Sequence, residues 1–384
     1  MSVPAQSFVL PLRLGKQTRD KAGASARQAG SVAEPAFDQL KKTLSATLRQ
    51  IHKPGGAILF VSGAQAPTNA VAEVVGQASK DLVALVVPAT GILTETAEVE
   101  GPTAVAGIVW SGKATAKVGS GGSEVARALA AAAPAGGTVA AFCSADGFDT
   151  AEISALAKGR DATFGAGTPS SIVLVERGRI TSDRVGALHL AGASAPLIES
   201  SPACKLVSEP MIVTKMDRTM VLELDGKPAL DVLGARAGGG RHGGLILVAV
   251  HDPADPSRFL VRPIRGIDPA RHAISVAADL EEGARVSFLV RDVAAAKEGL
   301  GEAARKAERR ATGSTPTFAL YLSCAGRGRA LYGESDVDIR ILKKRFPKIP
   351  IAGMHSAFEI VPWGPGEARM QLMSGVLALF RAAS

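Results

Sequence analysis

The sequence is poor in aromatic residues and cysteines, and it has no long apolar run. Only 4% of its 384 residues are Phe, Trp or Tyr, which leaves few rings on which nucleic-acid bases could stack. Its three cysteines, Cys143, Cys204 and Cys324, are widely spaced, which argues against a disulfide framework and indicates a reducing compartment. Charge-free stretches such as residues 128–143 are interrupted by Pro and Gly, so none supplies the ~20 apolar residues of a membrane span. We therefore expect a cytoplasmic protein that needs neither a membrane nor a nucleic acid.

The composition is that of an ordinary globular chain. Hydrophobic residues make up 46% and charged residues 21% of the sequence, and at ~150 residues per domain the length predicts two or three domains. A net charge of +8, from 44 basic against 36 acidic residues, favours a small anionic ligand.

Motifs that would bring a cofactor or a metal are incomplete. Residues 107–113 nearly form a phosphate-binding P-loop, but Ala114 lacks the required hydroxyl and the context is β-like. The glycine-rich run 238–244 enters a strand, so we interpret it as a surface loop, and His251-Asp252 as a strand-end turn. No cysteine pair has zinc spacing, and no Gly-x-Ser-x-Gly or His-Glu-x-x-His is present. We therefore predict no cofactor, no metal ligand and no catalytic residue of a conventional enzyme.

Hydrophobic periodicity predicts a layered α/β fold with repeated strand-helix-strand units. An amphipathic helix from Phe37 to Ile51 precedes the first unit. The predicted units are strand 57–62, a helix opening at Pro67 and strand 82–87; strand 138–143, helix 150–158 and strands 172–175 and 186–190; and strand 317–323, helix 335–346 and strands 349–352 and 375–380. A capping box of Ser335 and Asp338 is expected to start the last helix.

A β-rich stretch lies between the second and third units. Runs at 211–214, 220–224, 245–250, 259–265 and 285–290 are separated by turn residues, which predicts antiparallel strands, and 293–311 predicts a charged helix. We divide the chain into a partly ordered segment 1–30, a first domain 31–205 and a second domain 206–384. The basic residues of 1–30 also allow an organellar transit peptide, but we favour an early strand followed by a loop.

The candidate site follows the strand that ends at Ser323. Residues 324–333 form a glycine-containing loop that leads into a helix, and this polarity suits an anion because glycines expose backbone N–H groups and the helix N-terminus adds a favourable dipole. Cys324, Gly326 and Gly328 belong to this loop, and Arg327 and Arg329 offer forked donors for a carboxylate or phosphate. Alternatively, the arginines pair with the nearby acids Glu334, Asp336 or Asp338.

The next predicted strand delivers His355 and Glu359 to the same sheet edge, because parallel neighbours joined by a right-handed crossover end on one side. Glu359 could accept a ligand ammonium while an arginine binds its carboxylate. An alternative is a thiol-dependent enzyme with Cys324 as nucleophile and His355 as base. A buried, inert thiol and ordinary structural roles for His355 and Glu359 also fit the sequence.

Several separated segments, in the family's order, resemble FIST proteins. The segments similar to the amino-terminal FIST domain are 57–63 and 83–93, and those similar to the carboxy-terminal domain are 222–232, 324–328, 345–353 and 359–360. The resemblance covers roughly residues 30–384. It implies two FIST domains that form a sensory module for small ligands such as amino acids.

FIST domains occur alone or joined to signalling domains, and in animals to an F-box. The ~30 residues before the first helix are too few for an F-box. The resemblance therefore implies a separate signalling protein as the partner that carries the output. A pure protein-interaction scaffold without a ligand is a further alternative.

Overall fold

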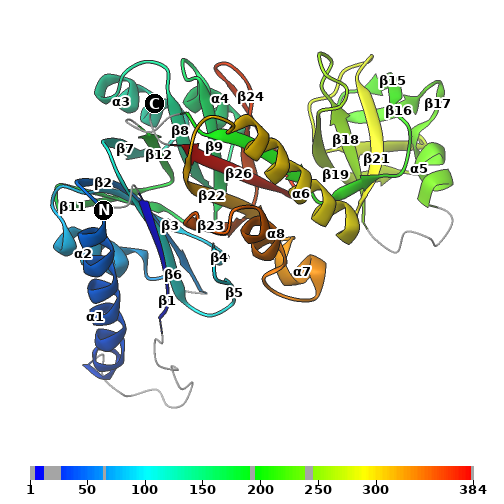
Figure 1. Cartoon of the computed structure of the whole chain (residues 1–384). Helices are drawn as coiled ribbons and strands as arrows, with labels where there is room; N and C mark the ends of the chain where they lie inside the picture. Colours follow the sequence, from blue (N-terminus) through cyan, green and yellow to red (C-terminus); the bar gives the residue numbers. More distant parts are fainter. Residues whose placement is uncertain (1–4, 13–26, 64–65, 191–194, 238–244, 382–384) are drawn as a thin grey trace. The chain divides into compact units, whose positions relative to one another are not determined.

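The computed structural model describes residues 5–12, 27–63, 66–190, 195–237 and 245–381 (Figure 1). The glycine-rich run 238–244 and most of the candidate transit peptide therefore lie outside the described residues. Among the helices in the described ranges, none combines the length and the apolarity that a membrane crossing requires. The chain forms two compact units, one of residues 1–201, 300–370 and 374–384 and the other of residues 202–299 and 371–373.

The first unit contains three mixed sheets of six strands each. The first sheet has the order β1 (Ala5–Pro11), β6 (Ala104–Ser111), β2 (Pro54–Ser62), β3 (Val83–Pro88), β10 (Ile172–Glu176), β11 (Arg179–Asp183). The second has the order β7 (Ala114–Gly119), β12 (Val185–Leu190), β8 (Thr138–Ser144), β9 (Ala162–Thr168), β24 (Glu359–Gly364), β25 (Glu367–Gln371). The third has the order β13 (Leu197–Pro202), β26 (Ser374–Arg381), β22 (Pro316–Cys324), β23 (Ile351–Ser356), β4 (Gly91–Thr94), β5 (Glu98–Glu100).

The three sheets share one plan, because the sequence repeats one run of elements three times. Each repeat consists of a helix, a strand, a second helix, a parallel strand, a hairpin and an antiparallel strand that returns beside the first. The first helices are α1 (Arg27–Gln50), α3 (Gly122–Ala132) and α6 (Val293–Arg310), and the second helices are α2 (Thr68–Ala78), α4 (Thr150–Ala157) and α8 (Val337–Arg345). The predicted α/β class is confirmed, and so are the first and third strand-helix-strand units. In the second unit the strand that follows the helix is β9, which was not predicted, and the predicted strand 172–175 lies in the first sheet as β10.

Each hairpin completes the sheet of a different repeat. The hairpin β4–β5 pairs with β23 of the third repeat, β10–β11 pairs with β3 of the first, and β24 pairs with β9 of the second. The cyclic exchange means that no sheet is complete without residues of another repeat. Residues 91–100 of the first repeat therefore lie at the edge of the sheet that carries the candidate arginine loop.

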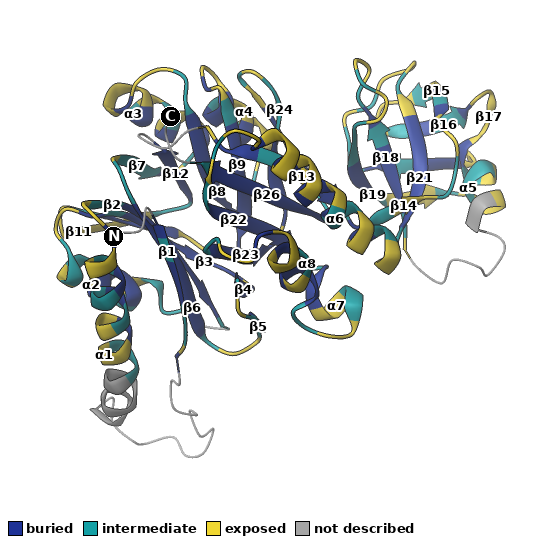
Figure 2. Cartoon of the chain, viewed as in Figure 1, coloured by how far each residue is buried: buried dark blue, intermediate teal, exposed yellow. Residues whose placement is uncertain are grey.

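Several of the few aromatic residues lie where the three sheets meet. Phe60 of the first sheet packs against Phe142 of the second, and Trp110 of the first stacks on Phe318 of the third. Phe164 of the second sheet contacts Phe380 of the third at a ring-centroid distance of 6.4 Å. Figure 2 shows the strands buried and the outer helix faces exposed. One shared apolar core thus fixes the three sheets against one another.

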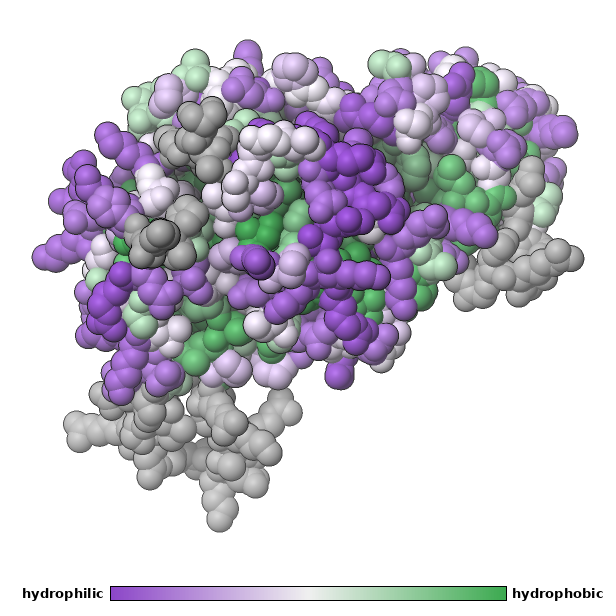
Figure 3. Space-filling view, viewed as in Figure 1, coloured by the Kyte–Doolittle hydropathy of each residue, from purple (hydrophilic) through white to green (hydrophobic). Residues whose placement is uncertain are grey.

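Helices cover the outer face of the third sheet. Leu300 and Ala304 of α6 and Ile339 and Leu342 of α8 are buried in one cluster with the sheet. The opposite faces of these two helices are charged, and Figure 3 shows hydrophilic side chains gathered over them. Ser323, His355 and Ser356, at the ends of β22 and β23, are buried polar residues of this sheet.

Glycines permit close backbone approach inside two of the sheets. A Cβ added to Gly353 in β23 would lie 1.8 Å from the Tyr321 carbonyl oxygen, and Gly165 occupies the matching place in β9. We expect Gly353→Ala to lower the free energy of unfolding by about 3 kcal/mol, because a backbone oxygen cannot move aside as a side chain can. Urea unfolding measures this change, and Gly364→Ala, which has open space around it, is the matched control. Equal stability of the two variants would contradict the close approach.

The second unit is an antiparallel barrel. Its ring runs β21 (Arg285–Arg291), β15 (Met211–Asp217), β16 (Met220–Leu224), β20 (Ala273–Val276), β19 (Phe259–Asp268), β18 (Ile246–His251), and β18 pairs back with β21. The short strands β14 (Cys204–Leu206) and β17 (Lys227–Pro228) and the helix α5 (Ala229–Ala237) accompany the ring. The predicted antiparallel β-rich middle is confirmed, and β20 is an additional strand that the sequence analysis did not predict.

Candidate functional site

The candidate site lies where β22 and β23 end. These strands are parallel, with Cys324 opposite Ser356 at their carboxyl ends. Residues 324–329, which we call the arginine loop, follow β22 and lead into the short helix α7 (Gly328–Tyr332). Ligands of open α/β sheets bind outside the carboxyl ends of parallel strands, so this edge is where a ligand is expected.

Arg327 is buried, and this corrects the expectation that it offers an open fork. Its side chain is 0% exposed, and its guanidinium donates to Asp338 through Nε at 2.8 Å and through Nη2 at 3.0 Å. Further donors reach the Ser201 carbonyl and the Tyr332 hydroxyl. Arg327 therefore follows the alternative expectation, in which the arginine pairs with a nearby acid, here Asp338. A buried guanidinium is stable only when a carboxylate balances its charge and its donors are hydrogen-bonded.

Asp338 is the acceptor at the centre of this network. Besides Arg327, the hydroxyls of Tyr321 and Tyr332 donate to its carboxylate, each at 2.7 Å. Burial acts to raise the pKa of Asp338, but the charge and hydrogen bonds of Arg327 outweigh burial and hold this pKa below its usual value. The ion pair therefore stays charged and fixes the arginine loop to the start of α8.

Arg329 is the exposed arginine of the loop. Its Nε donates to the Ser335 hydroxyl at 2.7 Å, and no described residue bonds its two terminal nitrogens. Its backbone N–H donates to Glu100 of β5 at 2.9 Å. Gly328 lies beneath the same carboxylate, since a Cβ there would be 2.5 Å from a Glu100 oxygen. Glu100 thus contacts the arginine loop, although no sequence motif singles it out.

Glu98, also on β5, holds the beginning of α8. Its carboxylate accepts the backbone N–H groups of Asp336 and Ile339, both at 3.1 Å, so Glu98 occupies the capping role that the sequence analysis gave to Ser335 and Asp338. The predicted capping box is therefore wrong. Burial, and then the negative charge of Asp338, raise the pKa of Glu98 to about 7.

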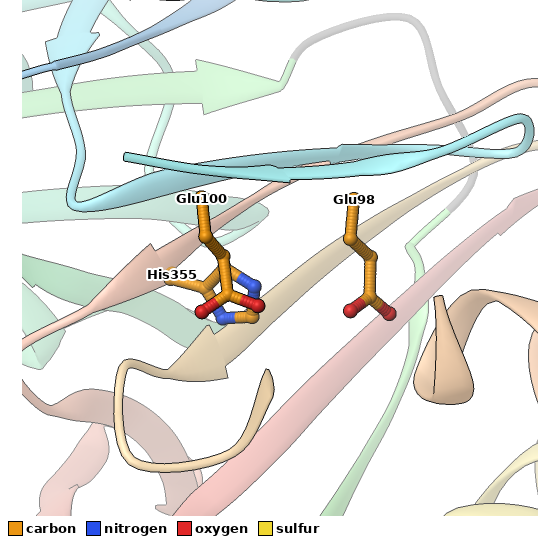
Figure 4. Close-up of side chains that lie close together, drawn as sticks. All are labelled: Glu98, Glu100 and His355. Carbon is orange, nitrogen blue, oxygen red and sulfur yellow. The ribbon is translucent and has the colours of Figure 1, made fainter. Parts of the chain in front are cut away.

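His355 lies inside β23, because that strand continues to Ser356 rather than ending at Ala352 as predicted. The side chain is buried, and neither ring nitrogen makes a hydrogen bond of good geometry with a described residue, although the Cys324 backbone lies close by. Burial lowers the pKa of His355, which keeps its ring neutral near pH 7. Figure 4 shows this ring beside the Glu100 carboxylate, with Glu98 extending in the same direction from β5.

Glu359 and Cys324 are also buried. Glu359 is wholly enclosed, and it bonds Ser356 and Ser374 rather than facing the arginine loop, so it cannot accept a ligand ammonium as predicted. The Cys324 side chain is 5% exposed, and its sulfur accepts the Gly326 N–H at 3.4 Å. Among the seven predicted site residues, only Arg329 has an exposed side chain whose terminal donors bond no described residue.

These features define a class: an α/β protein with three interlocked repeats and a polar cluster at one sheet edge. The particular family follows from two family models, the FIST N domain at residues 55–227 and the FIST C domain at residues 231–362. The chain belongs to the FIST family. FIST domains are recognised as sensory domains of signal transduction.

Mycobacterial relatives extend this comparison. The uncharacterized protein Rv0628c of Mycobacterium tuberculosis strain H37Rv is 34% identical over 219 residues, which cover 53% of this chain and 55% of the relative. The uncharacterized protein Mb0898c of Mycobacterium bovis is 31% identical over 212 residues, which cover 52% of this chain and 54% of the relative. The chain therefore spans about half the length of the curated relatives that it matches.

Proposed function

We propose that this protein is a sensory module that binds a small anionic or zwitterionic ligand, such as an amino acid, at the arginine loop. The observation that carries the proposal is the position of Arg329. Arg329 follows the carboxyl end of β22 by five residues, and its guanidinium uses only one donor within the described structure. A carboxylate can accept two parallel hydrogen bonds from the terminal nitrogens of such a group.

The buried neighbours support this role by holding the loop in one conformation. Arg327 and Asp338 fix the loop from within, and Glu100 fixes the Arg329 backbone from β5. A preformed loop loses little conformational freedom when a ligand binds, so a single exposed guanidinium contributes more to affinity there than on a mobile segment. Gly326 provides close backbone access on the same loop.

The proposed signal passes to a separate protein. Because Glu100 comes from the first repeat and the arginine loop from the third, a ligand held at this edge acts on two repeats together. If the interlocked sheets have two arrangements, such a ligand shifts the equilibrium toward the one it binds more tightly. The size of the shift is set by the difference between its binding free energies for the two arrangements. A signalling partner would then bind one arrangement better than the other.

Affinity for small carboxylates tests the proposal. Twenty amino acids and a set of mono- and dicarboxylates are screened by thermal shift, and calorimetry then measures the dissociation constant of each hit. We expect Arg329→Ala to weaken binding at least tenfold, which corresponds to about 1.4 kcal/mol. Arg369→Ala, at an exposed arginine 3.9 Å from Glu367, is the matched control and should leave the affinity unchanged.

Equal affinities of wild type and Arg329→Ala would remove the role of Arg329. A screen without any shift would instead favour the alternative of an interaction scaffold. The thiol-enzyme alternative rests on Cys324 and His355, and it requires the buried sulfur to become accessible to a substrate.

A further inference from the structure

Sheet register brings His355, Glu98 and Glu100 together from two distant parts of the chain. His355 pairs with Gly91 of β4, and Gly91 pairs with Glu100 of β5. His355, Gly91 and Glu100 therefore form one row across three neighbouring strands, on one face of the sheet. Glu98 lies on the same face of β5, two residues away from Glu100. One donor atom from each of the three side chains lies within 4.8 Å of the others (Figure 4).

A glycine creates the space for this cluster. A Cβ at position 91 would lie 2.6 Å from the His355 ring and 3.3 Å from the Glu100 Cγ. Gly167 at the end of β9 in the second repeat is equivalent to His355 at the end of β23. The Gly167 carbonyl accepts the backbone N–H of Ala357, as the His355 carbonyl accepts that of Thr90. At that place the ring of Phe358 covers Gly167. The Phe358 ring thus occupies this position beside Gly167, whereas at the third sheet the His355 imidazole lies beside Glu100 and near Glu98 (Figure 4).

The cluster has two unmet electrostatic requirements. His355 is 2% exposed, and neither ring nitrogen makes a hydrogen bond of good geometry with a described residue, although the Cys324 backbone lies close enough to act on the pKa of His355. At least one buried ring nitrogen is therefore left without a partner, which is costly for a buried polar group. Glu98 and Glu100 accept only backbone N–H groups, and neither forms an ion pair within the described part of the chain. The one buried guanidinium nearby, that of Arg327, is already paired with Asp338.

We propose that Glu98, Glu100 and His355 bind a divalent transition-metal ion of the zinc type. A cation accepts the lone pair of a neutral imidazole and neutralises two adjacent carboxylates, so it meets both requirements at once. A mixed set of one nitrogen and two oxygens suits zinc, with manganese as the oxygen-preferring competitor. This site goes beyond the proposed carboxylate sensor and does not depend on it.

The geometry needs only small side-chain movements. Ligands about 2.1 Å from a tetrahedral ion lie about 3.4 Å from one another, so the three donor atoms must close by at most ~1.4 Å. Each oxygen of Glu98 already accepts one N–H group and keeps a second lone pair for the ion. Three protein ligands leave one coordination position for water or an added ligand.

Zinc binding to the full-length chain tests the proposal. The protein is treated with a chelator, desalted and titrated with ZnCl2 in a calorimeter, and bound zinc is counted by mass spectrometry. We expect one ion per chain, and we expect His355→Asn and Glu100→Gln each to weaken its affinity at least hundredfold. The control His272→Asn changes an exposed histidine that pairs with Asp231, and it should bind zinc as wild type does.

Proton release provides a second measurement that does not depend on folding of the buried variant. Because metal ligands must be deprotonated, zinc binding should release protons, and more should be released at pH 6 than at pH 8. Titrations in two buffers with different ionisation enthalpies give this number. Absence of zinc binding, or equal affinity in wild type and Glu100→Gln, would overturn the proposal. Arg329→Ala should retain zinc, which separates failure of this site from failure of the carboxylate sensor.

Discussion

Replacing Asp338 with asparagine is expected to lower the free energy of unfolding by about 3–5 kcal/mol, the largest effect of a single polar substitution that we predict. The amide keeps the shape of the side chain but removes the charge that balances Arg327, whose side chain is 0% exposed. It also turns an NH2 group toward one of the two tyrosine hydroxyls, because Tyr321 donates to one oxygen of the carboxylate and Tyr332 to the other. A buried guanidinium would remain without a counter-charge, and urea unfolding at pH 7 measures the loss.

Two further variants show whether the charge pair is responsible. Glu308→Gln removes the carboxylate of an exposed pair with Arg345, and we expect it to cost less than about 1 kcal/mol. The double variant Arg327→Met with Asp338→Leu removes both buried charges, and it should be more stable than Asp338→Asn alone. A double variant as unstable as the single one would show that the cost arises from packing instead of from the unpaired charge.

Glu359→Gln is expected to stabilise the protein increasingly as the pH rises from 5 to 8. Burial raises the pKa of Glu359 to about 8, whereas the group titrates near 4.5 in the unfolded chain. Between these values the folded protein holds a proton that the unfolded chain releases, so rising pH favours unfolding of the wild type. Below pH 4.5 both states are protonated and the effect vanishes; above pH 8 it levels off.

The hydrogen bonds fit a neutral Glu359. The Ser356 hydroxyl lies 3.0 Å from the Ser323 carbonyl oxygen and 2.8 Å from Glu359 Oε1, and it has only one hydrogen to donate. A carboxyl proton on Glu359 lets it donate to Ser356, while Ser356 donates to Ser323. Glutamine can donate in the same way, so this substitution removes the titration and keeps the contacts.

The stability difference between Glu359→Gln and wild type gives the measurement. Urea unfolding at pH 5, 6, 7 and 8 should show this difference growing by roughly 2–4 kcal/mol. Glu367→Gln, at an exposed glutamate of β25, is the control, and its difference from wild type should stay within about 0.5 kcal/mol. A difference that does not change with pH would show that Glu359 is ionised in the folded protein.

Local patterns predicted most elements of the third repeat. The strand ending near Ser323 and the helix after it follow from apolar periodicity, and parallel pairing then places Cys324 beside Ser356. The resemblance to the FIST family added the two domains. Strand β9 was missed because its residues, Ala162–Thr168, are small and carry little apolar patterning.

The site was only partly predictable, because its decisive contacts join distant segments. Arg327 and Asp338 are 11 residues apart, so their pairing could be weighed as an alternative from the sequence. Glu98 and Ile339 are 241 residues apart, and no local pattern indicates that a strand of the first repeat caps a helix of the third. His355 and Glu359 were expected at one sheet edge, but His355 lies in β23 and Glu359 begins β24, and both side chains are buried.

The sequence by itself determined the local structure: alternating apolar residues specify the strands, periodic ones specify the helices, and glycines with arginines mark one loop. Tertiary structure alone decided which arginine is exposed and which acids accompany His355. The physical reason is that hydrophobic patterning specifies structure over a few neighbouring residues. The hairpin of the first repeat, by contrast, forms hydrogen bonds with the third repeat across more than 200 residues of chain, and no local pattern encodes them.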